Sequence, residues 1–470
     1  MSSTMGITEA TLFWGFLLVY GVIMYVLSPK SKSSESFYKG VDEQGKPVGQ
    51  WALTASIFIS WIFAKSVTNA ANLGATYGVV GGLAYASYWL SIPVAGYVIY
   101  LIRTQTGARS LQEFLTSRFG RLASLAFAAA ILIRLYNEIW SNTAVVGGYF
   151  GLPGQWQYYT AAMVFTGFTL AYSLKGGLRS SIFTDVIQTF VFVFFLGAVI
   201  FMILPANDPS ALLQSGRFRL TGGVDLLLVA LLQLFSYPFH DPVLTDRGFV
   251  NNEKTMLKSF VVAGLLGFVA VFVFSLVGVH ARLNGIDAMG NAPVAVGRSL
   301  GLAALFFMSV IMMTSAGSTL DSTFSSLAKS LAVDLPRLTQ RGIQNLPSVK
   351  VGACIMIVFA LLGNIPMFAG TDILLATTIS GTMVMGLAPV FLFYKLTNWS
   401  PWSFHLSFWT GLVLGIALAI GAVPQSWAIG DGDYALLLGT NAWGILLCTL
   451  GFFIPLVLAR LRDKPAVKAN

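Results

Sequence analysis

The chain has 470 residues, of which 56% are hydrophobic and only 10% charged, and it carries a formal net charge of +9. Soluble proteins contain about 25% charged residues, so this composition excludes a soluble enzyme, a disordered chain and a nucleic-acid-binding module. The two cysteines lie within apolar runs and the three histidines are scattered, which excludes a disulfide scaffold and a metal cluster of Cys or His.

Apolar runs recur along the whole chain. A transmembrane helix needs about 20 mostly apolar residues, and thirteen runs meet this length within a few residues. They lie at about 8–27, 51–77, 79–102, 121–149, 157–174, 180–204, 222–243, 258–281, 300–331, 349–366, 370–396, 404–423 and 438–460. Because the loops are too short for a soluble domain, we expect a single all-α integral membrane domain over residues 1–470.

Lys and Arg are distributed unevenly over the loops. With the N-terminus outside, 22 of the 28 basic residues fall in inside segments. Four fall in outside segments: Arg217, Arg219, Arg282 and Arg298. The remaining two, Lys65 and Arg134, lie within spans. Cytoplasmic loops are enriched in Lys and Arg. We therefore expect a multi-pass protein of the inner or plasma membrane with its N-terminus outside and its C-terminus cytoplasmic, and the basic charge does not indicate nucleic acid.

Two expected spans, 51–77 and 222–243, contain features that interrupt a regular helix. The first carries Lys65 near its centre, followed by polar and small residues. The second holds Pro238 and Pro242, each of which removes a backbone donor and clashes with the preceding turn. Interrupted spans at corresponding positions indicate an inverted-repeat transporter with a site near the bilayer midplane. We expect two five-helix repeats, at about 51–204 and 222–396, with one extra N-terminal helix and two extra C-terminal helices.

The ninth span, 300–331, is rich in Ser and Thr and contains Asp321. Hydroxyls in membrane helices often serve packing alone, but a carboxylate among hydroxyls offers oxygen ligands that suit a hard cation. Ionisable residues at membrane depth are candidates for function. Those within the spans are Lys65, Arg134, Glu138, Asp185, His240, Asp241 and Asp321.

Three segments resemble the sodium/solute symporter family, which has the LeuT-type fold. They are KGGLRSSIFTDVIQTF at 175–190, DPVLTDRGF at 241–249 and STLDSTFSSLAKSLAVDL at 318–335. The second ends near an arginine expected in the cytoplasm, Arg247. All three occur in order on the corresponding spans, and the resemblance covers about residues 8–460. It implies a LeuT-type 5+5 inverted repeat among about 13 transmembrane helices.

The resemblance also implies sodium ligands. A first site uses two carbonyls of the broken second span, one carbonyl of the ninth span and two hydroxyls there. A second site, found in some members, lies nearer the cytoplasm. The matching residues are Ile59, Ile62, Ser315, Ser318 and Thr319 for the first site, and Asp185, Asp321 and Ser322 for the second. The family usually has a hydroxyl residue where Asp321 stands, so this acid strengthens a cation site or binds a proton instead.

Lys65 departs most from the family, since the matching position in sugar-transporting members is acidic. Three interpretations remain open: an ion pair with Asp241, Glu138 or Asp185, an anchor for a substrate carboxylate, or an ammonium that fills the cation site. Buried charges are normally paired. Arg134 and Glu138 are spaced i, i+4 and are expected to neutralise each other. The expected substrate site comprises Lys65, Asp241, Trp61, Tyr237 and Glu138.

The leading hypothesis is a secondary active transporter that imports a small polar solute by sodium symport through alternating access. A lysine on one broken span and an aspartate on the other favour an amino-acid-like or carboxylate-bearing solute. The alternatives are a proton-coupled or sodium-independent carrier of the same fold, with Lys65 replacing the cation, and a transporter-like membrane sensor. No nucleophile–base pair supports an enzyme, and no obligatory protein partner is evident beside the solute and the lipid bilayer.

Overall fold

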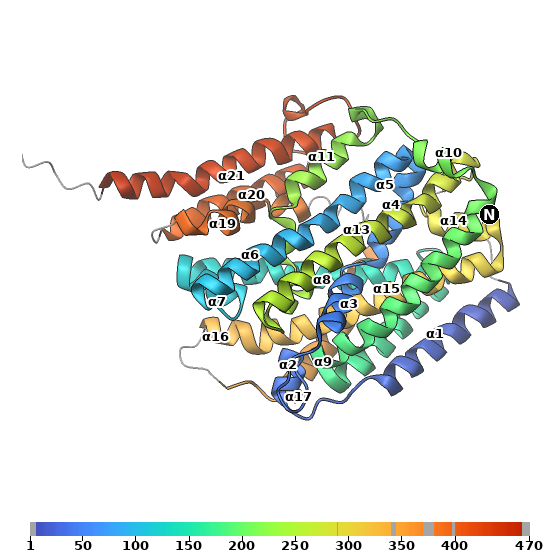
Figure 1. The fold of residues 1–470 in the computed structure, drawn as a ribbon, viewed down its shortest axis with the longest axis horizontal. Coiled ribbons are helices and arrows are strands. Elements are labelled where there is room, and N and C mark those ends of the chain that lie inside the picture. The colour runs from blue at the N-terminus through green and yellow to red at the C-terminus, as the bar shows by residue number, and fades with distance from the viewer. Residues whose placement is uncertain (1–5, 289, 340–344, 370–379, 397–399, 463–470) are drawn as a thin grey trace, which may run out of the picture.

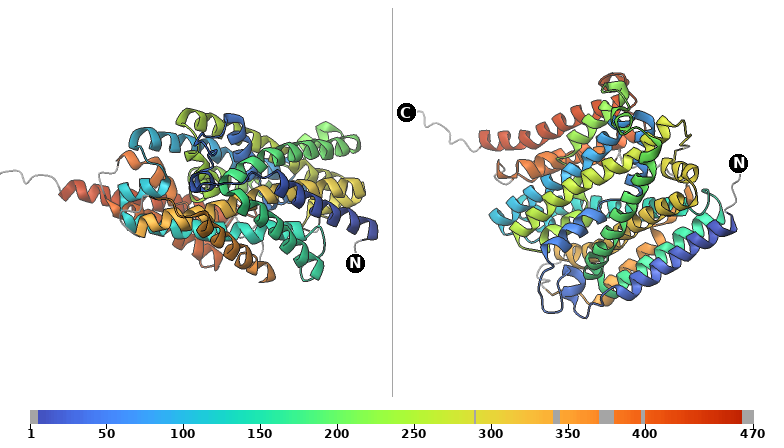
Figure 2. Two further views of the ribbon diagram at one scale, coloured as in Figure 1. Left: turned by 90° about the horizontal axis from the view of Figure 1, so that it is seen from below. Right: turned by 45° about the vertical axis from the view of Figure 1, so that its right-hand side comes forward.

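The computed structural model describes residues 6–288, 290–339, 345–369, 380–396 and 400–462, and their regular structure is helical. Figure 1 shows long helices packed side by side, with α1 at one edge of the molecule and α20 and α21 at the opposite edge. The right-hand view of Figure 2 also shows α1 and α21 on opposite sides of the central bundle. This arrangement agrees with the extra helices expected at each end of the chain.

The helices follow one another in the order that the sequence predicts. The first half of the chain holds α1 (Ile7–Leu27), α2 (Ser34–Lys39), α3 (Gln50–Ser60), α4 (Ala64–Tyr77), α5 (Val79–Ala86), α6 (Ser91–Thr106), α7 (Leu111–Phe119), α8 (Arg121–Gly147) and α9 (Trp156–Ile203). The second half holds α10 (Pro209–Gln214), α11 (Val224–Gln233), α12 (Pro242–Thr245), α13 (Glu253–Leu283), α14 (Ala292–Leu300), α15 (Leu302–Lys329), α16 (Leu335–Thr339), α17 (Val349–Leu362), α19 (Leu387–Leu392), α20 (Pro401–Ala419) and α21 (Ala435–Arg462). Short helices η4 (Tyr237–His240), η5 (Asp246–Phe249) and η6 (Ser330–Asp334) adjoin α11, α12 and α15.

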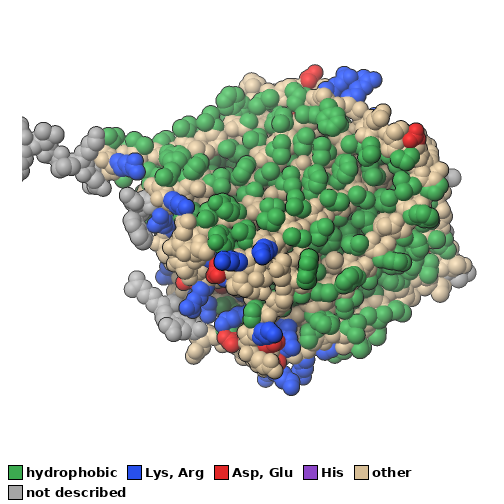
Figure 3. Space-filling view, in the orientation of Figure 1, with side chains coloured by type: hydrophobic (Ala, Val, Ile, Leu, Met, Phe, Trp, Pro, Cys, Tyr) green, Lys and Arg blue, Asp and Glu red, His purple; other side chains and the backbone are tan. Residues whose placement is uncertain are grey.

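The surface of the bundle is apolar, as a lipid-facing surface must be. Among the described residues, nine helices are long and apolar enough to cross a membrane, and α3 with α4 forms a tenth, bent span. Figure 3 shows hydrophobic side chains over the middle of one face, with Lys and Arg gathered at the lower left, where α2, α7 and α16 lie in Figure 1. The protein is therefore a multi-pass helical membrane protein.

Helix α9 comprises two of the expected spans, 157–174 and 180–204, because Gly177 interrupts it with φ 56° and ψ −138°. The Ser180 Oγ atom lies 3.1 Å from the Tyr172 carbonyl, whereas eight residues of straight helix would separate them by about 12 Å. The chain therefore turns sharply here. A Cβ at Gly177 would lie 2.5 Å from the Phe37 carbonyl, so the turn needs glycine.

The expected total of thirteen spans is not confirmed. The expected span 222–243 contains the ten-residue α11, then irregular backbone and η4. In the expected span 370–396, residues 370–379 lie outside the described residues. The expected repeat boundaries likewise stay a prediction.

Both expected helix interruptions are present and touch each other. Helices α3 and α4 meet at 59° across residues 61–63. The second interruption separates α11 from α12, and Pro242 occupies the first position of α12. At this position a backbone N–H has no partner within the helix, so a proline costs no hydrogen bond. The Trp61 Nε1 atom, at the first break, donates to Asp241 Oδ2, at the second, over 3.0 Å. The two broken helices thus meet within the bundle.

Candidate functional site

Carbonyl groups at the α3–α4 break face hydroxyls of α15. Ser315 donates its hydroxyl to the Ile62 carbonyl in a short hydrogen bond, and Thr319 Oγ1 donates to the Ser60 carbonyl over 3.2 Å. Ser60, Ser315 and Thr319 are fully buried. Uncharged oxygens gathered in this way are ligands of hard cations. The arrangement brings together Ile62, Ser315 and Thr319, as the resemblance predicts.

The structure differs from the expected first sodium site in three details. The Ile59 carbonyl accepts a hydrogen bond from Ile62 N at 3.1 Å. Ser315 directs its hydroxyl to the break, whereas the resemblance implied its carbonyl. Ser318 donates to the Asp185 carboxylate in a short bond rather than facing the break. Successive helical residues are rotated by about 100°, so Ser318 and Thr319 face different neighbours.

Helix α8 supplies the cap of α4. The Ala64 backbone N–H donates to Asn142 Oδ1 at 3.0 Å, satisfying one of the donors left free where a helix begins. Asn142 Nδ2 in turn donates to Glu138 Oε2 over 3.0 Å. The break is therefore stabilised by side chains of α8 and α15, and not by glycine or proline within it.

Four buried charges, which we call the charge quartet, join the two broken helices through α8. Lys65 Nζ lies 2.7 Å from Glu138 Oε1, Glu138 forms a short ion pair with Arg134, and Arg134 Nη2 lies 3.0 Å from Asp241 Oδ2. These side chains are at most 1% exposed. The expected pairing of Arg134 with Glu138 is confirmed. Of the three acids considered for Lys65, it binds Glu138, and its ammonium also donates to Ser141 at 3.0 Å.

Aromatic rings line the quartet. Trp61, Phe63, Tyr85, Trp89 and Tyr237 surround a cavity of about 20 Å³, which has room for about one water molecule. The ammonium of Lys65 lies 5.3 Å from the centroid of the Phe63 ring, and the Arg134 guanidinium lies 5.3 Å from the Tyr237 centroid. The expected substrate residues therefore lie together, with both cations over aromatic faces.

Nearer the end that carries α2 and α7, two acids and an arginine form a second group, which we call the acid cluster: Asp185, Asp321 and Arg247. Arg247 Nη2 lies 2.9 Å from Asp185 Oδ2 and donates to Ser322 Oγ at 2.7 Å. Within the described residues, Asp321 accepts hydrogen bonds only from hydroxyls, which belong to Ser181 (2.7 Å), Thr184 (2.9 Å) and Ser322 (3.2 Å). All three members are fully buried. The three expected second-site residues, Asp185, Asp321 and Ser322, thus come together.

Sequence reasoning missed the position of Arg247. It is expected in a cytoplasmic segment, but its side chain is fully buried and also donates to Ser56 Oγ at 2.6 Å. The charged residues that follow it in sequence suggested a loop. One feature of the sequence indicated the buried position: Arg247 lies only five residues after Pro242, at the expected helix break. A residue so close to a break within the bundle can still lie inside the bundle. The acid cluster thus contains two carboxyl groups and one guanidinium, and within the described residues the Asp321 carboxyl group has no ion pair with a basic side chain.

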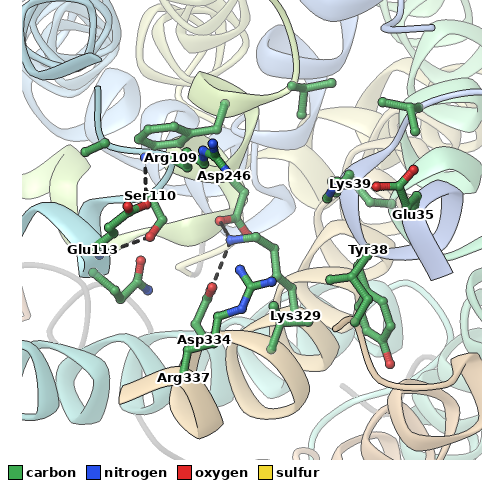
Figure 4. Close-up of a pocket in the computed structure, with 18 of the residues that line it drawn as sticks. Glu35, Tyr38, Lys39, Arg109, Ser110, Glu113, Asp246, Lys329, Asp334 and Arg337 are labelled. Carbon is green, nitrogen blue, oxygen red and sulfur yellow. Dashed lines mark hydrogen bonds and ion pairs between the residues drawn. The ribbon is translucent and has the colours of Figure 1, made fainter. Parts of the chain in front are cut away.

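A large cavity opens at the same end of the molecule. It measures about 1490 Å³ and is lined by residues of α2, α7, η5, η6 and α16, with five acidic and five basic side chains; we call it the vestibule. Figure 4 shows Lys329 between Asp246 and Asp334 on its wall. On α2, a hydrogen bond from Lys39 lowers the pKa of Glu35, and burial raises the pKa of Tyr38.

The opposite end is held together by contacts between α4 and α14. Asn72 Nδ2 donates to the Gly290 carbonyl at 2.7 Å, and Asn72 Oδ1 accepts from Ala292 N at 2.8 Å. Arg282 also donates to the Thr76 carbonyl, the penultimate residue of α4. The quartet and the break therefore lie between a closed end and an end with a wide cavity.

Comparisons with known proteins agree with this geometry. The model of the sodium:solute symporter family matches residues 44–209. The human sodium/myo-inositol cotransporter is 26% identical over 206 residues, which are 43% of this chain and 28% of the relative. The sodium/glucose cotransporter of Vibrio parahaemolyticus is 25% identical over 310 residues, covering 57% of this chain and 54% of the relative. The matched region thus spans about a quarter to a half of the length of these relatives.

Solved structures resemble the whole fold. A sodium-coupled sialic acid symporter in a substrate-bound outward-open state superposes with a TM-score of 0.69 at 16% identity, over 97% of this chain and 98% of that one. The nucleobase-cation-symport-1 family transporter Mhp1 gives 0.56 at 14% identity, over 92% and 95%. The fold is therefore that of LeuT-type transporters. The resemblance to the sodium/solute symporter family is confirmed, and the matched residues 44–209 include the first of the three sequence segments.

Proposed function

Because the chain resembles the sodium:solute symporter family, whose members and relatives are transporters and not enzymes, we propose that it imports a small polar solute by sodium symport. One observation carries this proposal most directly. At the α3–α4 break, the carbonyls of Ser60 and Ile62 face the hydroxyls of Ser315 and Thr319. Freed carbonyls of a broken membrane helix, completed by hydroxyls of a neighbour, can coordinate a coupling cation.

The acid cluster supports a second cation position. Asp185 is paired with Arg247, whereas in the part of the chain that the structure describes the Asp321 carboxylate has only hydroxyl donors, at 2.7–3.2 Å. A lone negative charge inside a membrane protein is costly, so a bound sodium ion would stabilise it. A proton would serve as well, and this same observation favours a proton-coupled carrier as the second candidate.

Replacement of the cation by Lys65 receives less support. Its ammonium is bound to Glu138 and Ser141 on α8, and the hydroxyls of α15 bond the carbonyls of the break instead. Lys65 therefore acts as a member of the charge quartet in this conformation.

The quartet favours a solute that carries both charges, such as an amino-acid-like zwitterion, or a carboxylate-bearing solute. It contains two cations and two anions in a row, from Lys65 through Glu138 and Arg134 to Asp241. A carboxylate of the solute can take the place of Glu138 at Lys65, and an ammonium can take the place of Arg134 at Asp241. Each exchange keeps every buried charge paired, as a low-dielectric site requires.

The vestibule supports alternating access. It opens at the end where the basic loops are expected in the cytoplasm, while α4 and α14 close the other end. We propose that this conformation faces the cytoplasm and that the N-terminus lies outside a cell membrane.

Uptake by the purified protein in liposomes tests the function. A panel of amino acids, organic anions and sugars would be offered with an inward sodium gradient, with a proton gradient, and with neither. Uptake of a zwitterion or carboxylate only with the sodium gradient is expected. Uptake driven by protons alone would favour the second candidate, and uptake indifferent to both would contradict ion coupling.

A further inference from the structure

A row of serines on α15 and the first residue of η6 continues from the acid cluster toward the vestibule. Ser318, Ser322, Ser326 and Ser330 are four residues apart, so they lie along one side of the helix. The first two bond members of the acid cluster, since Ser318 donates to Asp185 and Ser322 to Asp321. Ser330 begins η6, directly after Lys329 on the vestibule wall. The row thus spans the distance between the cluster and the cavity.

The last two hydroxyls of this row have no hydrogen-bond partner within the described part of the chain. Ser326 is 1% exposed and Ser330 is 6% exposed. Other buried serines bond their own helix, as Ser309 does with the Phe306 carbonyl at 2.7 Å. A buried polar group that lacks a partner costs free energy, so these two hydroxyls are available for a ligand.

Asp246 adds a carboxylate oxygen, without a partner among the residues that the structure describes, close to Lys329, which directly precedes Ser330 in the chain. It follows α12, which packs against α15. Asp246 is 7% exposed, and within the described residues its Oδ2 has no partner, while its Oδ1 lies 2.6 Å from Lys329 Nζ. Lys329 also lies 3.0 Å from Asp334 Oδ2. Figure 4 shows this ammonium between the two acids, so the protein supplies its own cation at this point.

We propose that Asp246, Ser326 and Ser330 form a sodium-binding station between the acid cluster and the vestibule, and that Lys329 is a tethered cation that a passing ion displaces. One carboxylate and two hydroxyls are the oxygen donors that a hard monovalent cation takes. A path of several weak sites lets an ion leave as well as enter. The inference rests on the proposed sodium coupling, since it describes how the coupled ion reaches the cytoplasmic side.

Removal of the tethered charge tests the station without any solute. The melting temperature of the purified variant Lys329→Gln would be measured at increasing sodium chloride, with choline chloride keeping the ionic strength constant. The rise in melting temperature with sodium gives the apparent sodium affinity. Without the competing ammonium, the apparent sodium affinity is expected to rise about tenfold over the wild type, because a like charge near the ion is gone. Adding Ser326→Ala and Ser330→Ala should abolish the gain. Adding Ser309→Ala and Ser275→Ala, two buried serines that bond only their own helix, should leave it intact.

Equal gains in the two triple variants, or no gain in Lys329→Gln, would overturn the station. If Lys329→Gln fails to fold, a second measurement tests the station. Radioactive sodium should leave liposomes that hold Ser326→Ala/Ser330→Ala severalfold more slowly than liposomes that hold Ser309→Ala/Ser275→Ala. Equal release rates would also overturn it. The proposed function can fail separately from the station. If Lys329→Gln gains sodium affinity but the wild type takes up no solute in a sodium gradient, only the proposed function is contradicted.

Discussion

Replacing Lys65 with methionine removes one charge of the quartet and nearly preserves the side-chain volume. Lys65 and Glu138 are both fully buried and 2.7 Å apart. Breaking a buried ion pair by removing one partner costs about 3–5 kcal/mol, because the other charge stays buried without compensation. Glu138 keeps its short pair with Arg134 and its bond from Asn142. The loss of unfolding free energy is therefore expected at the lower end, at about 3 kcal/mol.

The double variant Lys65→Met/Glu138→Gln decides whether charge is the cause. It leaves Arg134 and Asp241 as a neutral pair, and the amide oxygen that replaces the carboxylate of Glu138 can still accept from Arg134. We expect it to be more stable than Lys65→Met by about 2 kcal/mol, which is within the coupling found for residues in direct contact. Thermal or denaturant unfolding of the detergent-solubilised proteins measures the order of stability.

An exposed pair of the same residue types serves as the control. Lys39 and Glu35 are 2.7 Å apart on α2 with side chains more than half exposed, and such i, i+4 pairs contribute about 0.3–0.5 kcal/mol. Lys39→Met and Lys39→Met/Glu35→Gln should therefore melt close to the wild type. If the quartet double variant proved no more stable than Lys65→Met, the loss would come from packing, and the electrostatic reasoning would be wrong.

Three further predictions test other parts of the structure. Ser315→Ala/Thr319→Ala should raise the sodium concentration for half-maximal uptake about tenfold and leave solute affinity at saturating sodium unchanged, whereas Thr314→Ala, whose hydroxyl bonds its own helix, should not. A cysteine at Asp287 in a background free of Cys354 and Cys448 should be labelled from outside and one at Lys39 only from inside; the reverse labelling would refute the topology. Gly177→Ala should lower stability by more than about 1 kcal/mol, because φ is 56° and Phe37 blocks the new Cβ, while Gly197→Ala on the same helix meets open space and should not.

The helix order and both interruptions could be predicted because their signals are local. Apolar length marks a span, and Pro238 and Pro242 mark the second break wherever the rest of the chain lies. The pairing of Arg134 with Glu138 was equally accessible, since one helical turn separates them. The first break was expected from the composition around Lys65, but residues 61–63 contain neither glycine nor proline, and the cap from Asn142 comes from a helix far along the chain.

The partners of the buried charges could not be predicted from the sequence, because they are set by contacts between distant segments. Lys65 had three candidate acids, and only packing of α4 against α8 selects Glu138. Arg247 was expected in the cytoplasm, since nothing in its neighbours indicates that α12 directs it toward Asp185. Ser318 and Thr319 are adjacent in sequence, yet the rotation of α15 assigns them to different groups of ligands.

The charge quartet has as many basic as acidic groups, whereas the acid cluster has one more acid than it has bases, and this difference makes Asp321 decisive for the coupling ion. The quartet is neutral by itself, whereas Asp185 and Asp321 face one arginine. If sodium compensates the remaining charge, Asp321→Asn should lower the Hill coefficient of uptake for sodium and leave its pH dependence unchanged. If a proton compensates it, the same variant should leave the sodium dependence intact and abolish the pH dependence. Uptake measured against sodium at several pH values separates these results, and Asp225→Asn, on α11 and bonded to the Tyr434 and Leu226 backbone, is the control. A variant with wild-type sodium and pH responses would show that the hydroxyls of Ser181, Thr184 and Ser322 stabilise the charge by themselves.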